Sequence, residues 1–164
     1  MEIRRMKADD ANEYWELRLE ALQNNPEAFA SSYEEAVERK NPLEGVAANL
    51  ERAVTLGAYD GGLVGVITFV RGSGLKTKHK GDFFAVYVTP SYRGKGAGKA
   101  LLKEAIDYVK RVDGLVKVNI SVSSVNKTAK QLYHNMGFKT YANEEKALYV
   151  NGEFLDEEHM VLFL

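Results

Sequence analysis

Residues 91–105 read SYRGKGAGKALLKEA, and the interpretation of the whole chain begins from them. Three glycines alternate with lysine and alanine, and an amphipathic helix is predicted to begin directly after them. Glycine is a poor helix former, so three of them at a helix entrance indicate that bare backbone is needed there. We interpret the stretch as a turn whose free N–H groups bind an anion, most often a phosphate, at the positive end of a helix.

Positive charge gathers around this predicted helix start. Six cations and two acids lie between Arg93 and Arg111, although the formal charge of the whole chain is −1. The plain alternative is a glycine-rich turn with solvated lysines. The residues predicted to form the anion site are Arg93, Gly94, Lys95, Gly96, Ala97, Gly98 and Lys99.

Composition limits the classes of protein that fit. With 164 residues, 45% apolar and 27% charged, the chain reads as one ordinary domain, residues 1–164. The absence of cysteine excludes a disulfide framework, a thiol nucleophile and cysteine-bound zinc. Three dispersed histidines indicate no metal site, and the near-neutral charge predicts neither a nucleic-acid nor a membrane partner. The charged N-terminus and the lack of a long apolar run predict a cytoplasmic protein.

The order of predicted elements indicates an α/β or α+β domain with a central mixed sheet. A first strand at 1–7 precedes helices at about 9–24 and 31–40 and a short one after Pro42. Strands follow on both sides of Gly61-Gly62 and in DFFAVYV, residues 82–88. The second half reads as the glycine loop, a helix to about Val112, a strand, a helix at 127–135 and a hairpin at Asn151-Gly152.

Two common phosphate loops do not fit the glycine stretch. A P-loop requires a glycine five positions before Gly98, where Arg93 stands, and a hydroxyl where Ala100 stands. A dinucleotide loop that begins at Gly94 requires a third glycine at position 99, which is Lys99.

The spacing Arg93-x-x-Gly96-x-Gly98, between VYVTP and KALL, instead resembles the acetyl-CoA pyrophosphate loop of the GNAT superfamily of N-acetyltransferases. A second motif, SVNKTAKQLYHNMGFK at 124–139, resembles the later GNAT helix that opens with asparagine, carries a tyrosine seven residues on and ends in Gly-Phe. The resemblance implies a mixed, mostly antiparallel sheet flanked by about four helices. It further implies an acetyl-CoA-binding core at about 81–142 and acceptor-side helices at about 9–52.

The resemblance also implies roles for individual residues. Tyr133 would be the general acid that protonates the departing thiolate, and its structural alternative is to fill a helix–sheet interface. Asn126 would hold the pantetheine arm, or simply cap its helix. Backbone groups of Val86, Tyr87 and Val88 would pair with pantetheine like an added strand, and the Val88 N–H could face the oxyanion.

The general base and the acceptor pocket are less clearly marked. Some protein-acetylating relatives have a glutamate five residues before the asparagine, where this chain has Ser121. Asp82 is the first candidate base, and a solvated acid at a strand start is its alternative. Phe29, Tyr33 and Glu34 would form a pocket for a cationic amine, unless the acids of their helix face water.

These observations predict an enzyme that moves an acetyl group from acetyl-CoA, as co-substrate and without a metal, to a primary amine in a ternary complex. The acceptor would be a small-molecule amine or an exposed lysine, and a homodimer is possible. Two alternatives stay open: a CoA-binding module that senses acyl-CoA without turnover, and a nucleotide-binding domain that uses the same anion site.

Overall fold

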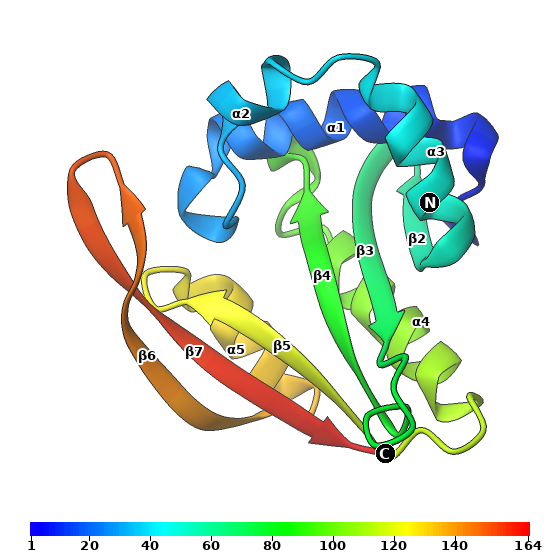
Figure 1. Cartoon of the computed structure of the whole chain (residues 1–164), viewed down its shortest axis with the longest axis vertical. Helices are drawn as coiled ribbons and strands as arrows, with labels where there is room; N and C mark the ends of the chain where they lie inside the picture. The colour runs from blue at the N-terminus through cyan, green and yellow to red at the C-terminus, as the bar shows by residue number, and fades with distance from the viewer.

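The computed structural model describes residues 1–164 and contains one seven-stranded sheet, ordered β1-β2-β3-β4-β5-β7-β6 (Figure 1). Only β4 and β5 are parallel neighbours, and every other pair is antiparallel. The predicted mixed, mostly antiparallel sheet is therefore confirmed. The strands are β1 (Glu2–Arg5), β2 (Val54–Tyr59), β3 (Leu63–Arg71), β4 (Lys80–Val88), β5 (Lys117–Ser123), β6 (Lys139–Val150) and β7 (Glu153–Phe163).

Five α-helices accompany the sheet, and each corresponds to a helix that the sequence predicts, although the family resemblance implied about four. They are α1 (Ala11–Asn24), α2 (Tyr33–Val37), α3 (Pro42–Arg52), α4 (Ala97–Lys110) and α5 (Lys127–Asn135). Short 3₁₀ turns lie at Ala8–Asp10, Pro26–Ala28 and Pro90–Tyr92. The helix expected at 31–40 is shorter than predicted. Ser32 caps its start and it ends at Val37. None of the helices combines the length and the apolar composition needed to cross a bilayer.

Two hydrophobic cores lie on opposite faces of the sheet. The larger contains the apolar stripe of α4, including Leu101 and Val109, together with Ile67 of β3. The smaller contains side chains of α1 and α3 together with Val66. Because successive strand residues point to opposite faces, neighbours such as Val66 and Ile67 serve different cores. Helices α4 and α5 therefore cover one face, and α1 and α3 cover the other (Figure 1).

The decisive feature for function is the point at which β4 and β5 separate. Their parallel pairing runs from Lys80–Lys117 to Phe83–Ile120 and then stops. Just beyond it Ala85 has a φ of 51°, and the register between β3 and β4 shifts at the same place. This bulge bends β4 away from β5, and the two strands diverge toward α1 and α5 (Figure 1). A gap lined by unpaired β4 backbone follows from the bend.

Local signals in the second half of the chain form the expected structures. Asn126 Oδ1 accepts a hydrogen bond from Ala129 N at 3.1 Å, which caps α5. Gly137, with a φ of 98°, ends the same helix. Asn151 and Gly152 both have positive φ, as a tight hairpin turn between β6 and β7 requires.

Candidate active site

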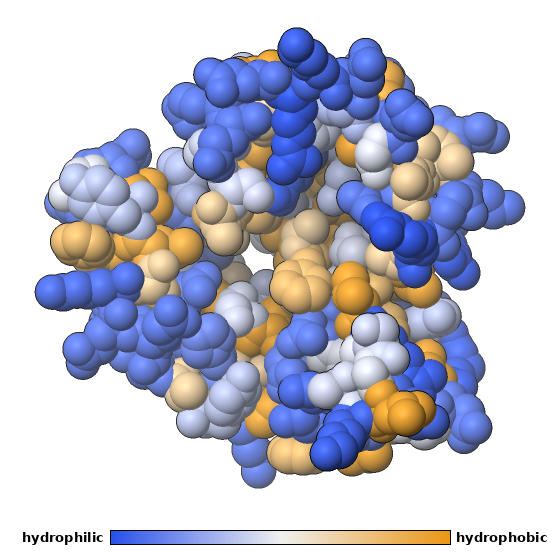
Figure 2. All heavy atoms as spheres, in the orientation of Figure 1, coloured by the Kyte–Doolittle hydropathy of each residue, from blue (hydrophilic) through white to orange (hydrophobic).

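The separation of β4 and β5 opens a single large cleft of about 1640 Å³. The glycine loop before α4 and one side of α5 border it on one face of the sheet, and α1 and the segment after it border it on the other. Figure 2 shows the hollow near the centre of the view, with hydrophobic residues around it. Apolar and polar residues both line it, and a large concave cleft is the usual location of a small-molecule site.

The N-terminus of α4 forms an anion cradle at one end of the cleft. Gly96 is the N-cap with a φ of 88°, and Gly94 has a φ of 72°. The first intrahelical bond runs from Ala100 N to Gly96 O, so the N–H groups of residues 97–99 have no partner within the helix. No side chain caps them. These free donors and the helix dipole favour a phosphate at this position.

Gly98 lies in the first turn of α4 and lines the cleft. A Cβ built on it would meet Leu132 Cδ2 at 3.6 Å and Val88 Cγ2 at 3.7 Å, which are ordinary contacts. The fold itself therefore does not require glycine at this position. The open backbone leaves room for close approach of a ligand, and the residues present fit a pyrophosphate there.

The three cations that the sequence predicts around the loop have different surroundings. Lys99 lines the cleft. Arg93 also borders it, but its Nη2 lies 2.6 Å from Asn25 Oδ1 and its Nε donates to Val88 O at 2.9 Å, so it braces the loop. Lys95 does not line the cleft, and its ammonium lies 5.2 Å from the centre of the Tyr92 ring. The structure therefore does not place Lys95 beside a ligand in the cleft.

The edge of β4 beyond the bulge offers backbone groups to the cleft. Tyr87 is paired with Val66 of β3, and two residues later Thr89 N donates to Val64 O at 2.9 Å. Since backbone groups of successive strand residues point to opposite sides, those of Val86 and Val88 point away from β3. Of the three residues predicted to pair with the pantetheine arm, only Val86 and Val88 therefore direct backbone groups away from β3. Tyr87 contributes its side chain, whose hydroxyl donates to Glu20 Oε1 at 2.9 Å.

Tyr133 and Asn126, which the sequence places together, both line the cleft from α5. The side-chain oxygen of Asn126, Oδ1, caps the helix, which leaves the side-chain NH₂ of Asn126 free. Tyr133 is buried in the larger core, and its hydroxyl has no hydrogen-bond partner within the protein. Burial raises the pKa of Tyr133, so its phenol stays protonated and can act as a donor.

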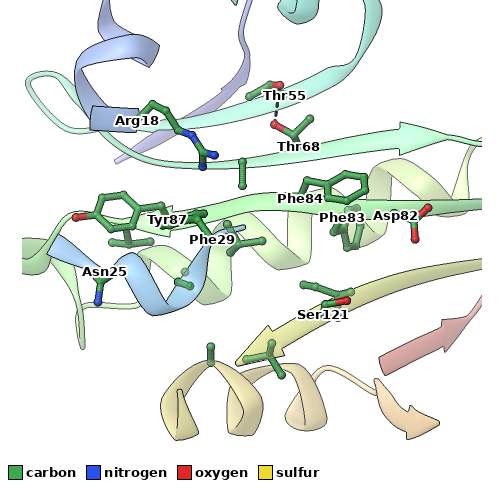
Figure 3. Close-up of a pocket in the computed structure, with 18 of the residues that line it drawn as sticks. Arg18, Asn25, Phe29, Thr55, Thr68, Asp82, Phe83, Phe84, Tyr87 and Ser121 are labelled. Carbon is green, nitrogen blue, oxygen red and sulfur yellow. Dashed lines mark hydrogen bonds between the residues drawn. The ribbon is translucent and has the colours of Figure 1, made fainter. Parts of the chain in front are cut away.

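The side of the cleft near α1 and α2 carries a positive charge where the sequence predicts acidic residues. Phe29 lines it as predicted, but Tyr33 and Glu34 do not. In the short helix α2 the buried residue is Ala36, while Glu34 is exposed and Glu35 is tied to Ser32 in a capping box. The acids of α2 therefore face water, which corrects the prediction of an acidic acceptor pocket. Instead, the guanidinium of Arg18 points from α1 into the cleft (Figure 3).

A row of polar side chains crosses β5, β7 and β6 on this face. Ser121 Oγ lies 2.8 Å from His159 Nδ1, and His159 Nε2 lies 2.8 Å from Glu144 Oε2. Ser121 lines the cleft, as does the neighbouring Glu157, whose carboxyl pKa is raised by burial. The sequence signals only alternating polar residues in β5 and β7. It does not reveal the pairing of Ser121 with His159 that brings this row together.

Asp82 lies in the paired part of β4, before the strands separate. It lines the cleft and accepts a hydrogen bond from Asn119 Nδ2 at 3.1 Å. Asn119 Oδ1 and Ser123 Oγ also border the cleft and are buried without a protein partner. Since buried polar atoms are rarely left unpaired, these two atoms mark a part of the cleft wall whose hydrogen bonding the protein alone does not complete.

Comparison with known proteins identifies what this architecture belongs to. The family model of the acetyltransferase (GNAT) family matches residues 12–138. The chain belongs to the GNAT acetyltransferase family. It is an acetyl-CoA-dependent acetyltransferase, and the family and enzyme class predicted from the sequence are confirmed.

Individual relatives agree with this membership. A spermidine N(1)-acetyltransferase of Vibrio cholerae is 25% identical in an alignment of 146 residues that covers 86% of this GNAT chain and 83% of the relative. An L-methionine sulfoximine/L-methionine sulfone acetyltransferase of Salmonella typhimurium is 35% identical in an alignment that covers 49% of this chain and 46% of that relative. A Salmonella typhimurium structure named as an acetyltransferase, solved with its cofactor acetyl-CoA, has a TM-score of 0.85 and 26% identity, with 100% of this chain and 94% of that chain covered.

Proposed function

We propose that this acetyltransferase moves the acetyl group of acetyl-CoA directly to the primary amine of a small molecule, with both substrates in the cleft together. The observation that carries the proposal is the continuity of the cleft through the gap between β4 and β5. Acetyl-CoA would enter from the side of α4 and α5, and the acceptor from the side of α1. The names of two relatives, which act on spermidine and on methionine sulfoximine, also indicate amine-bearing small molecules.

The donor side would hold acetyl-CoA through backbone groups. The free N–H groups at the start of α4 would bind the pyrophosphate, with Lys99 adding charge. Val86 and Val88 would pair with the pantetheine arm, and Asn126 would hold it from α5. The Val88 N–H would donate to the carbonyl oxygen as negative charge develops on it.

Tyr133 would supply the proton that the departing thiolate needs. Attack of a neutral amine on the thioester carbonyl forms the C–N bond, and collapse then breaks the C–S bond. The sulfur leaves as a thiolate, takes a proton from the Tyr133 hydroxyl and departs as free CoA thiol. The nitrogen of the new amide then gives up its extra proton, which restores the Tyr133 phenol. The burial that raises the pKa of Tyr133 keeps this proton in place before the reaction.

The acceptor amine must lose a proton before it attacks, and Ser121 with His159 would receive it. With His159 Nε2–H donated to Glu144, Nδ1 has a free lone pair toward the Ser121 hydroxyl. The ammonium proton would move to Ser121 Oγ while the Ser121 proton moves to His159 Nδ1. Glu144 would then stabilise the imidazolium. Ser121 lies beyond the last β4–β5 pair and borders the gap, whereas Asp82 lies before it, so Asp82 is the second candidate base.

Thiol release with a panel of primary amines, with mass spectrometry of the acetylated product, tests the proposal. Intersecting initial-velocity lines would indicate a ternary complex, and parallel lines would contradict it. Ser121→Ala and His159→Gln should lower kcat/KM about 100-fold near neutral pH. The deficit should shrink as pH rises, because more of the amine is then already neutral. A larger loss in Asp82→Asn than in His159→Gln would transfer the base role to Asp82.

A further inference from the structure

Arg18 is a cation in the cleft that has no acid to neutralise it. Its side chain extends from the middle of α1 toward β4, above Phe29 (Figure 3). The guanidinium carbon lies 4.7 Å from the centre of the Phe29 ring. Arg18 forms no hydrogen bond and no ion pair within the protein, although an arginine carries five N–H donors.

Withdrawing the Arg18 guanidinium from water costs free energy unless an anion binds to it. Arginine side chains withdrawn from water are normally paired, because a charge in a poorly solvated site loses its hydration. Burial lowers the pKa of Arg18. Tyr14 raises this pKa in part, and the nearby Arg39, which also borders the cleft, lowers it. The ring of Phe29 covers one face of the guanidinium but satisfies none of its N–H groups. The donors along its edge are left for a ligand.

The wall of the cleft that faces Arg18, formed by β5 and β7, carries proton acceptors instead of a cation. Glu157 borders the cleft from β7, and Ser121 presents its hydroxyl from β5 with His159 and Glu144 behind it. A molecule that spans the cleft therefore meets a cation on the α1 side and proton acceptors on the β5–β7 side. Arg18 and Ala85, the bulge residue next to the gap, line the same small cavity, so the cationic site is close to the expected reaction centre.

We propose that the acceptor carries a carboxylate close to its amine, as an α-amino acid does, and that Arg18 binds this carboxylate. The guanidinium offers two parallel N–H groups that match a carboxylate in geometry and charge. The amine of the same molecule is then directed toward Ser121 and Glu157. A polyamine, which has only cationic groups, would be repelled by Arg18. The inference rests on the proposed function, because it specifies the acceptor of that same site.

A matched series of acceptors tests the inference. A panel of L-amino acids first identifies the one that gives the fastest thiol release. That amino acid, its carboxamide and its decarboxylated amine are then compared, with spermidine as a further arm. The amine of the carboxamide is less basic than that of the amino acid, so amine protonation favours the amide. A preference for the carboxylate over the carboxamide therefore cannot arise from protonation.

The expected result is that kcat/KM for the amino acid exceeds that for its carboxamide and amine by about 10- to 100-fold. Arg18→Met should abolish this preference, mainly by raising KM for the carboxylate substrate, and Arg18→Lys should keep part of it. Arg111→Met removes the same charge from the exposed surface of the α4 end and should leave the preference intact. Unchanged affinity for acetyl-CoA and an unchanged melting temperature would show that Arg18→Met is folded.

Two results would overturn the inference while the proposed function stands. One is acetylation of spermidine or of the decarboxylated amine as efficiently as the amino acid. The other is a loss of kcat in Arg18→Met that is equal for all acceptors, which would place Arg18 at the developing oxyanion instead.

Absence of thiol release with every amine would overturn the proposed function. The carboxylate site is then tested by calorimetry on the CoA-bound protein, with an N-acetyl amino acid and its carboxamide as probes. Binding of the carboxylate form that is lost in Arg18→Met supports the site, and equal binding of both probes overturns it.

Discussion

Arg93 is hydrogen-bonded to Asn25, with 2.6 Å between Nη2 and Oδ1, and this bond joins the glycine loop to the segment that follows α1. The Nε of the same guanidinium donates to Val88 O at 2.9 Å, at the end of β4. One side chain thus connects three segments that border the cleft. The planar fork of arginine suits this task, because its donors leave in fixed and different directions.

Arg93→Lys should weaken acetyl-CoA binding about 10-fold, because a single ammonium cannot make both bonds and the loop is less well held. Stability should fall by about 1 kcal/mol for the lost hydrogen bonds. Calorimetric titration with acetyl-CoA and urea denaturation measure the two effects. Lys95→Met is the matched control, since Lys95 points at Tyr92 instead of the cleft. Arg93→Lys keeps the positive charge and Lys95→Met removes one, so weakened binding in Lys95→Met with unchanged binding in Arg93→Lys would show that net charge matters here and not the bracing geometry.

Gly98→Ala should separate stability from cofactor binding. The added Cβ finds only ordinary contacts, and alanine favours a helix over glycine by about 1 kcal/mol in a helix interior. The melting temperature should therefore stay the same or rise, while the dissociation constant for acetyl-CoA rises at least 10-fold because the methyl group obstructs the pyrophosphate. Thermal unfolding and calorimetry measure the pair of effects. Unimpaired acetyl-CoA binding would remove the steric explanation of this glycine.

Tyr133→Phe should lower kcat by about 100-fold or more, the range typical of a lost general acid. Because burial raises the pKa of Tyr133, the required protonated form is lost only above that raised pKa. The wild-type kcat should therefore show no falling limb from this group up to about pH 10, the ordinary pKa of a phenol. A pH profile of kcat checks this, with exposed Tyr149→Phe as control. A falling limb below pH 10 that Tyr133→Phe lacks would contradict the prediction.

Asp10→Asn should reduce stability in a pH-dependent way. The carboxylate pairs with Arg4 at 2.7 Å and accepts from Lys7 N, and these bonds lower its pKa to about 2. A depressed carboxyl pKa stabilises the fold above the unfolded-state value near 3.8, and this stabilisation is lost as pH falls through about 2. The variant should lose about 1 kcal/mol near neutral pH, because the partly exposed Arg4 is screened by solvent.

Urea denaturation at several pH values between 7 and 2 checks the Asp10 prediction. The difference in unfolding free energy between wild type and Asp10→Asn should shrink toward zero across the acid range. Arg4→Gln should reproduce most of the effect, since it removes the partner instead of the carboxylate. A difference that is constant with pH would mean that the loss comes from packing and not from the charge.

Much of the donor side was predictable because its signals are local in the chain. The φ values of Gly94 and Gly96, and the cap at Asn126, follow from residues within a few positions of one another. Tyr133 shares the cleft with Asn126 because seven residues are two turns of one helix. These elements hardly depend on the rest of the molecule, so spacing alone was sufficient to locate them.

The acceptor side was predicted poorly for the opposite reason. Tyr33 and Glu34 were expected in the pocket, but the burial of Ala36 turns their helix so that Glu34 faces water. Arg18 gave no signal, because a single arginine on an amphipathic helix is usually solvated. The packing of α1 over β4 is what places Arg18 in the cleft.

The sequence by itself therefore determined the anion cradle and the helix with Asn126 and Tyr133, because each depends on short-range backbone geometry. The class of enzyme followed from the resemblance of these two motifs to the GNAT family. Tertiary structure decided where β4 leaves β5, which charges face the acceptor and that Ser121, His159 and Glu144 form one row. Those relationships join residues up to 141 positions apart, as between Arg18 and His159. Strand order and register set them, and these depend on how the whole chain buries its two hydrophobic cores.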